Sequence, residues 1–217
     1  MQDPITHYWK KRLDEAAQAL EAAGFAAHVA EDAAAACEII FGDVVPGQAP
    51  KSVGFGGSVS LVKAGVYDMA KGLEGVEVLD TYDKTLPDED KMELRRKSLL
   101  VDLFFTGTNA ITEEGVLVNL DMIGNRVGAL AFGPRNVVVL AGRNKLCADF
   151  EDAVARIKDY AAPVNTARLD KETPCAKTAR CSDCASPDRI CNTWVVNEKC
   201  FPKGRIIVVL VNEDLGF

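Results

Sequence analysis

The chain has 217 residues, of which 48% are hydrophobic, and its formal net charge is -7 at pH 7. This length and apolar content suit a single globular domain, which we expect over residues 1–217. The acidic balance, without a basic run, argues against nucleic acid or an anionic membrane surface as the main partner. The apolar stretches are too short to span a bilayer and the amino terminus is polar, so we expect a cytoplasmic protein.

The first hundred residues alternate between helical and strand patterns. Trp9, Leu13 and Leu20 recur at helical spacing among charged residues, and Gly24 is expected to end their helix. In all, the sequence predicts helices over residues 8–23, 33–41 and 90–99 and strands over residues 25–29 and 76–79. Such alternation predicts an α/β layer architecture with a mainly parallel sheet.

A glycine-rich turn lies between a strand and a helical pattern. Gly56, Gly57 and Ser58 follow an apolar run and precede a helix expected from Leu61 to Met69. This arrangement can direct backbone N–H groups at an anion such as a phosphate or carboxylate. The segment lacks the spacing of a dinucleotide fingerprint and the lysine of a P-loop, so a plain tight turn is the alternative.

Residues 101–146 form the predicted floor of a binding site. They contain two short apolar runs that each end in glycine and predict strands. Between these runs, residues 110–112 and 116–120 flank the sequence Glu-Glu-Gly at 113–115, which is typical of a hairpin turn. Parallel sheets bind ligands outside the carboxyl ends of their strands. The candidate ligand-binding residues in this stretch are Thr108, Asn109, Gly115, Asn119, Asp121, Asn125, Arg126 and Lys145.

The last third of the chain is predicted to be less regular. A helix is expected over residues 149–160, and residues 161–164 are expected to end it. Residues 165–204 show neither helical nor strand periodicity and hold five of the seven cysteines. Residues 205–212 are a final apolar strand. The sequence therefore predicts a cysteine-rich loop insertion, residues 165–204, before the last strand.

Four cysteines in this insertion have the spacing C-x5-C-x2-C-x6-C: Cys175, Cys181, Cys184 and Cys191. Thiols this close together in a cytoplasmic protein are more often metal ligands than disulfides. A bound ion would also supply the ordering energy that a loop with little apolar content lacks. We predict a four-cysteine metal centre, either zinc or an iron–sulfur cluster, with disulfides or free thiols as the alternative. Cys200 lies close enough in sequence to replace one ligand.

Several motifs together resemble the LUD domain of lactate-utilisation proteins. They lie at residues 56–58, 106–119, 124–126, 133–134 and 215–217. The resemblance implies a three-layer α/β/α sandwich with a mainly parallel sheet, as in CoA transferases and ribose-phosphate isomerases. It also implies work with iron–sulfur partners in the oxidation of lactate to pyruvate. By motif, Glu113 matches the acidic residue of the family's turn, and Gly115, Arg126 and Pro134 match its other positions. The four-cysteine loop departs from the minimal domain.

Three hypotheses about function follow. The first is a LUD-type protein that binds a small anionic metabolite between the 56–58 loop and the 108–126 hairpin. In this hypothesis, Arg126 and Lys145 bind the negative charge of the metabolite, and Glu113 is the candidate general base. The plainer interpretation of Glu113 is an exposed turn residue. The second hypothesis is a non-catalytic metal-binding subunit of an iron–sulfur oxidoreductase. The third is an isomerase or transferase that acts on a sugar phosphate or a CoA ester.

Overall fold

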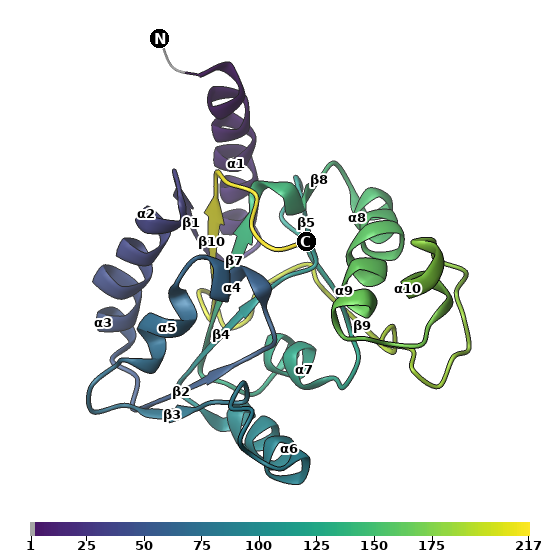
Figure 1. The fold of residues 1–217 in the computed structure, drawn as a ribbon. Helices are drawn as coiled ribbons and strands as arrows, with labels where there is room; N and C mark the ends of the chain where they lie inside the picture. Colours follow the sequence, from purple (N-terminus) through teal and green to yellow (C-terminus); the bar gives the residue numbers. More distant parts are fainter. Residues whose placement is uncertain (1–2) are drawn as a thin grey trace.

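The structure, a computed structural model, describes residues 3–217. Six strands form a parallel central sheet in the order β1, β10, β7, β4, β2, β3 (Figure 1). In that order they are β1 (Ala26–Ala30), β10 (Ile206–Val211), β7 (Asn136–Gly142), β4 (Leu103–Gly107), β2 (Ser52–Phe55) and β3 (Glu77–Leu79). Strands β10 and β7 are rich in β-branched residues and are buried on both faces, as a parallel sheet covered by helices requires.

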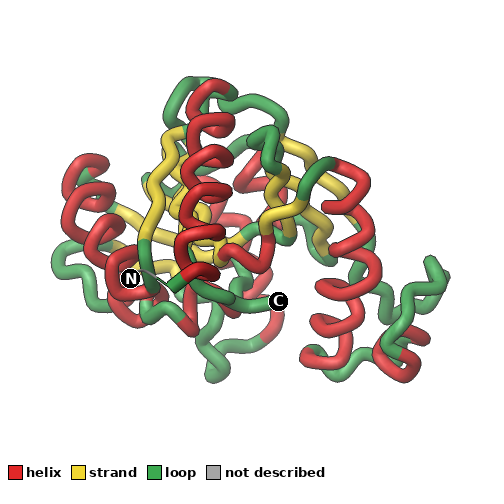
Figure 2. Tube along the Cα trace, turned by 90° about the horizontal axis from the view of Figure 1, so that it is seen from above, coloured by secondary structure: helices red, strands yellow, loops and turns green. Residues whose placement is uncertain are grey.

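Helices cover both faces of this sheet. The helices on one face are α1 (Pro4–Ala22) and α7 (Asn125–Ala131), and those on the other are α2 (Ala33–Glu38), α3 (Val45–Gln48), α4 (Val59–Lys63) and α5 (Val66–Lys71). Along β7, Val138 and Leu140 join the core beneath α2 to α5, whereas Val137 and Val139 join the core beneath α1 and α7. Seen from above, helices lie on either side of the strands (Figure 2). The predicted three-layer α/β/α sandwich is confirmed.

A smaller second sheet stands beside the first. Its strands are, in order, β8 (Leu146–Cys147), β5 (Ala110–Thr112), β6 (Leu117–Asp121) and β9 (Thr193–Asn197). The pair β5 and β6 is antiparallel, so the predicted hairpin is confirmed. Strand β9 pairs antiparallel with β6. The prediction that residues 165–204 lack regular structure is therefore wrong at this strand, whose alternate residues are exposed and give a weak apolar pattern.

The helix predicted over residues 149–160 extends further than expected. It runs as α8 (Phe150–Arg156), a π-helical turn (Ile157–Ala161) and α9 (Ala162–Arg168). The prediction that residues 161–164 end it is wrong. Pro163 lacks an N–H, and in an α-helix its ring would clash with a carbonyl of the preceding turn. The wider π turn lies directly before it, and the same arrangement precedes Pro46, where a π turn (Ile39–Val44) joins α2 to α3.

Other helices also differ from the predicted bounds. Asp3 caps α1 and Pro4 occupies its first turn, so this helix begins four residues earlier than expected. The helix expected from Leu61 to Met69 breaks at Gly65, where φ is +78°, into α4 and α5. The remaining helices are α6 (Asp88–Lys97), α10 (Pro174–Thr178) and single 3-10 turns at Ser98–Leu100 and Arg143–Lys145. Across residues 3–217, no helix has the length and apolar character needed to cross a membrane.

The hairpin turn between β5 and β6 packs against α1, and Gly115 makes this possible. Its φ is +83°, and an added Cβ would lie 2.7 Å from the backbone of Ala19 and Leu20. We expect Gly115→Ala to reduce the free energy of unfolding by roughly 1–3 kcal/mol, through a strained backbone and overpacking. Gly42→Ala is the matched control, because nothing lies within 4 Å of its added Cβ. Urea unfolding should show the control unchanged or more stable by about 0.4–1 kcal/mol.

Candidate functional site

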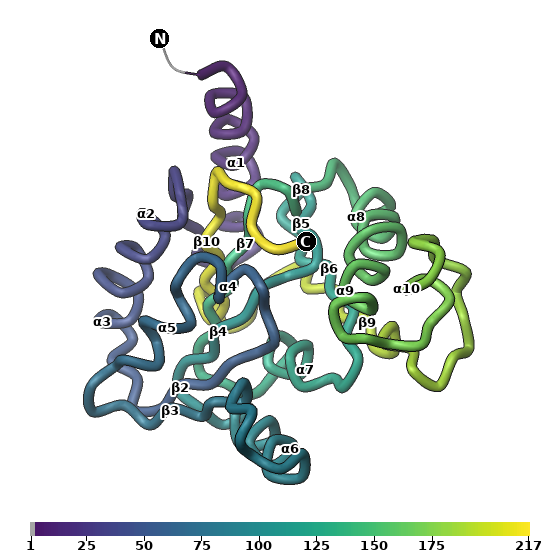
Figure 3. Tube along the Cα trace, in the orientation of Figure 1, coloured from purple at the N-terminus to yellow at the C-terminus, as the bar shows by residue number. Residues whose placement is uncertain are grey.

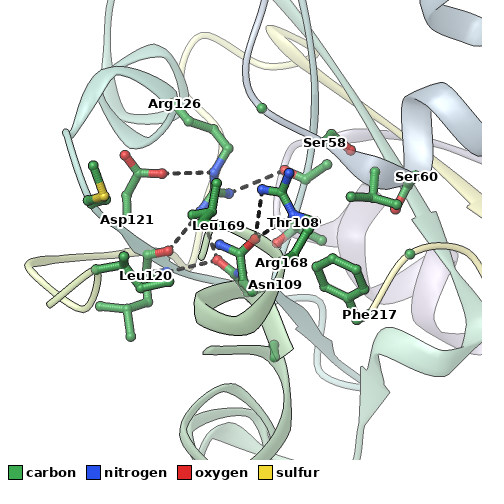
Figure 4. Close-up of a pocket in the computed structure, with 18 of the residues that line it drawn as sticks. Ser58, Ser60, Thr108, Asn109, Leu120, Asp121, Arg126, Arg168, Leu169 and Phe217 are labelled. Atoms are coloured by element: carbon green, nitrogen blue, oxygen red, sulfur yellow. Dashed lines mark hydrogen bonds and ion pairs between the residues drawn. The ribbon is translucent and has the colours of Figure 1, made fainter. Parts of the chain in front are cut away.

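A cavity of about 350 Å³ opens at the carboxyl ends of β2 and β4, which are neighbouring parallel strands (Figure 4). Strand β2 leads into the glycine-rich turn, and β4 leads into the start of the hairpin. The two loops that the sequence predicts to meet therefore line one cavity. The predicted residues on its wall are Gly57, Ser58, Thr108, Asn109, Asp121, Asn125, Arg126 and Lys145.

Four other predicted residues lie outside the cavity wall. Gly56 lies behind Arg126, and a Cβ added there would be 2.9 Å from the Cγ atom of Arg126. Asn119 is fully buried, and its side-chain oxygen accepts hydrogen bonds from Arg126 and from Thr108. Gly56 and Asn119 thus support the wall from behind. Glu113 and Gly115, in contrast, lie on the hairpin turn against α1.

The Arg126 guanidinium makes a complete set of hydrogen bonds with residues 107–121. Its Nε donates to Asp121 at 3.0 Å, and its two terminal nitrogens donate to Asn109, Asn119 and backbone carbonyls. A guanidinium has five N–H donors, and here all five have partners within the protein. The group is 7% exposed. Arg126 therefore holds Asp121 and Asn109 in place and has no donor left over for a ligand.

Lys145 is a buried cation on the same wall. Its Nζ donates to the hydroxyl of Ser60 at 3.0 Å and to the carbonyl of Thr108 at 2.9 Å. Within residues 3–217 no carboxylate pairs with it. Burial, together with the charges of Arg156 and Arg126, lowers the pKa of Lys145 to about 7. An ammonium has three donors, so one remains for a ligand in the cavity.

The glycine-rich turn is held by a tyrosine that the sequence analysis did not single out. The backbone N–H of Ser58 donates to the hydroxyl of Tyr82 at 2.7 Å, and that hydroxyl donates to the carbonyl of Gly56 at 3.1 Å. The Ser58 side chain caps α4, whose five residues give only a weak dipole. The backbone N–H of Ser58 is thus already hydrogen-bonded and is not free to bind an anion. The turn therefore shapes the cavity wall more than it supplies anion-binding groups.

Sequence analysis also missed the residues that α9 brings to the cavity. Asn165, Arg168 and Leu169 line it, because the helix continues past Pro163. Arg168 is exposed, and it donates two hydrogen bonds to the side-chain oxygen of Asn165. Figure 4 shows Arg168 and Phe217 close together at this side of the cavity. The signal for these residues would have been a helical pattern that continues past Pro163.

Glu113 pairs with Arg12 of α1 and is absent from the cavity wall. The Arg12 guanidinium also lies 5.1 Å from the ring centre of Trp9. Both charged side chains are partly exposed, so the pair contributes about 0–1 kcal/mol to stability. We expect Glu113→Gln to change stability by no more than this and to leave ligand affinity unchanged. A loss of binding measured by calorimetry, in a variant with an unchanged urea midpoint, would contradict this placement.

The four predicted metal ligands lie apart from this cavity. Cys175, Cys181, Cys184 and Cys191 line a separate cavity of about 20 Å³ between α9, α10 and the following loop. Cys200 is not among the lining residues and packs instead in the core beneath α1. Within residues 3–217, no three cysteine, histidine or acidic side chains are already close enough to share one ion.

Comparisons with known proteins identify the family. The chain is similar in structure to the crystal structure, at 1.70 Å resolution, of a DUF162 family protein from Deinococcus radiodurans. The two share 14% sequence identity with a TM-score of 0.48, over 94% of this chain and 97% of that one. No curated protein matches the sequence. Residues 13–211 match the sequence profile of the LUD domain. The chain therefore belongs to the LUD domain family.

Proposed function

We propose that this protein binds a small anionic metabolite, a hydroxy acid or keto acid of the size of lactate or pyruvate, in the cavity at the carboxyl ends of β2 and β4. The observation that carries the proposal is the charge of the wall. Four basic side chains and one acidic side chain line the cavity, in a chain whose net charge is -7. The basic residues are Arg95, Arg126, Lys145 and Arg168, and the acidic one is Asp121.

Three of these cations have no carboxylate partner within the described residues: Arg95, Lys145 and Arg168. Asp121 neutralises Arg126, and we assign the ligand to Lys145 and Arg168. A carboxylate between them would receive charge-assisted hydrogen bonds, each worth about 1.5–3 kcal/mol. Leu120 and Leu169 supply apolar surface on the same wall for a methyl group. The volume, at the low end for ligand cavities, suits a small acid.

Calorimetric titration tests this proposal. Lactate and pyruvate should bind, whereas lactamide and pyruvamide, which have the same shape without the charge, should not. Arg168→Gln should weaken acid binding by roughly tenfold or more, because one charged hydrogen bond is lost. Arg135→Gln is the matched control, since Arg135 is exposed and pairs with Asp102 on another part of the surface. Equal binding of acids and amides would overturn the proposal.

The affinity for the acid should depend on pH through Lys145. Its pKa in the free protein is about 7, and a bound carboxylate favours the protonated amine and raises that value. Lactate and pyruvate stay ionised between pH 6 and 9, so their charge does not change. We expect a nearly constant Kd below pH 7 and up to about tenfold weaker binding per pH unit above it. A Kd independent of pH across this range would contradict the role of Lys145.

The family's association with lactate utilisation supports a place in oxidation of lactate to pyruvate. We propose that the cavity holds the acid while an iron–sulfur oxidoreductase subunit accepts the electrons. Mixing the chain with lactate alone should then give no pyruvate, because in this proposal the electrons pass to the other subunit. Pyruvate formation by the isolated chain, without added oxidant, would contradict this division of labour.

The alternative is an isomerase or transferase that acts on a sugar phosphate or CoA ester. One observation favours it: an amine with a pKa near 7 inside a cavity can act as a general base. Lys145 would take that role, since Glu113 lies elsewhere. Turnover of ribose 5-phosphate or of an acetyl-CoA and carboxylate pair, lost in Lys145→Met and kept in Glu113→Gln, would favour this alternative over simple acid binding.

A further inference from the structure

The second cavity gathers side chains that the proposed function does not use. Its wall includes four of the seven cysteines of the chain, and all four are free thiols. Cys175 is buried in α10, and the other three lie in the loop between α10 and β9. Figure 3 shows this segment as a yellow-green loop beside α10, at the edge of the molecule. The fold thus brings together thiols spread over 17 residues of sequence.

Two cations and a carboxylate line the same cavity. Lys158 and Arg189 both pair with Asp183, and this network lies beside the four thiols. Arg189 also donates to the backbone carbonyls of Cys184 and Cys191, which fixes two of the four cysteines. The hydroxyl of Thr173, only 1% exposed, lies 3.3 Å from the Cys175 sulfur and can donate to it. Four cysteines around one small cavity are the ligand set that structural zinc and iron–sulfur clusters use.

The loop's own packing does little to hold it in place. Among the described residues, four non-glycine residues have a positive φ, and two of them, Ala179 and Asp183, lie in this loop. Each costs roughly 1–2 kcal/mol relative to a right-handed conformation. The large side chain that this loop buries is Ile190. Exposed ion pairs of Asp183 with Lys158 and Arg189 add little, and a metal bound by four thiolates would supply much more ordering energy.

We propose that Cys175, Cys181, Cys184 and Cys191 bind one thiolate-ligated metal centre, which orders the loop between α10 and β9. The cavity of about 20 Å³ has room for a single ion. Zinc fits that volume directly, and an iron–sulfur cluster has the same ligand chemistry but needs the loop to open. The thiols have to move inward to ligate an ion. Residues 179–192 contain neither helix nor strand, so this adjustment leaves the sheets unchanged.

Elemental analysis of the full-length chain, purified without oxygen, tests the proposal. We expect about one zinc per chain and a colourless protein. Iron with equimolar sulfide and a visible absorption band would support the four-cysteine site and overturn the choice of zinc. Cys181→Ser with Cys184→Ser should lose the metal, whereas Cys37→Ala, a cysteine outside the cavity, should keep it. Metal at less than a tenth of an equivalent, both as purified and after addition of zinc or of iron and sulfide, would overturn the site.

A second measurement covers the case in which the double variant fails to fold. Removal of the metal from the wild-type chain with a chelator should increase proteolysis between residues 179 and 192 by tenfold or more. Re-addition of zinc should reverse this, while circular dichroism of the sheets stays constant. Unchanged proteolysis after metal removal would overturn the ordering role. Mass spectrometry after alkylation separates the disulfide alternative, since four alkylated cysteines in this segment exclude it.

Discussion

Lys145→Met is expected to make the protein more stable and at the same time to abolish binding of small carboxylates. The native lysine is 5% exposed and has no carboxylate partner in the part of the chain that the structure describes. Replacing a buried charge with an apolar side chain of similar length gains roughly 1–4 kcal/mol. In a chain of this size, each kcal/mol raises Tm by about 2–4 °C. Loss of its donor to the ligand should weaken acid binding by about 10- to 100-fold.

The gain in stability should depend on pH. The pKa of Lys145 is about 7 in the folded protein, against 10.5 for an ordinary lysine, so the unfolded chain binds more protons between those two pH values. Burying the charged lysine therefore costs its full free energy below pH 7, and this cost disappears as the pH rises towards 10.5. The stability difference between Lys145→Met and wild type should follow the same curve in urea titrations. Lys63→Met, at an exposed position of α4, should change stability by less than about 0.5 kcal/mol. A less stable Lys145→Met variant at pH 7 would contradict the argument.

Arg126→Gln is expected to cost about 3–5 kcal/mol, a large fraction of the 5–15 kcal/mol typical of a domain. The substitution leaves the carboxylate of Asp121 without its cation and removes donors from Asn109, Asn119 and two carbonyls. Each of these acceptors is wholly or largely buried, so water does not replace the lost bonds fully. Because Arg126 holds Asp121 and Asn109 in place on the cavity wall, binding of the acid should be lost together with stability.

The matched control is Arg135→Gln. Arg135 also pairs with an aspartate at 3.0 Å, but its side chain is 81% exposed, against 8% for Arg126. We expect this control to cost about 0–1 kcal/mol in urea unfolding and to leave binding unchanged. Should Arg126→Gln fail to fold, Asp121→Asn keeps the other bonds of the guanidinium and should give a smaller loss. Equal losses in the free energy of unfolding at positions 126 and 135 would show that burial does not decide how much each ion pair contributes to stability.

Local patterns in the sequence predicted most of the fold. Continuous apolar runs predicted β4, β7 and β10, and the Glu-Glu-Gly turn predicted the hairpin between β5 and β6. These elements depend on burial and turn chemistry within a few residues, which a sequence displays directly. The ends of helices were harder to predict from the sequence. Pro163 was predicted to end its helix because proline disrupts an α-helix, and a π turn that accommodates proline has no sequence pattern of its own.

That error in the helix had a consequence for the site. Because the residues of α9 were predicted to be irregular, Arg168 was not among the predicted ligand-binding residues. The helix nevertheless places it on the cavity wall. Lys145 was predicted as a ligand-binding residue, but its burial beside Ser60 and Thr108 became apparent only in three dimensions. Glu113 shows the opposite case, since the hairpin turn that carries it faces α1 and Arg12. Which face a turn meets depends on how distant elements pack.

The sequence by itself determined the layer architecture, the family and the two loops that form the cavity. Periodicity, glycine positions and short motifs are properties of neighbouring residues, and the ends of parallel strands meet at one edge by geometry. Only the tertiary structure decided which cations are free to bind an acid. Whether Arg126 or Lys145 has a spare donor depends on partners many residues away, and burial, which sets the pKa of Lys145, is a property of the whole packed chain.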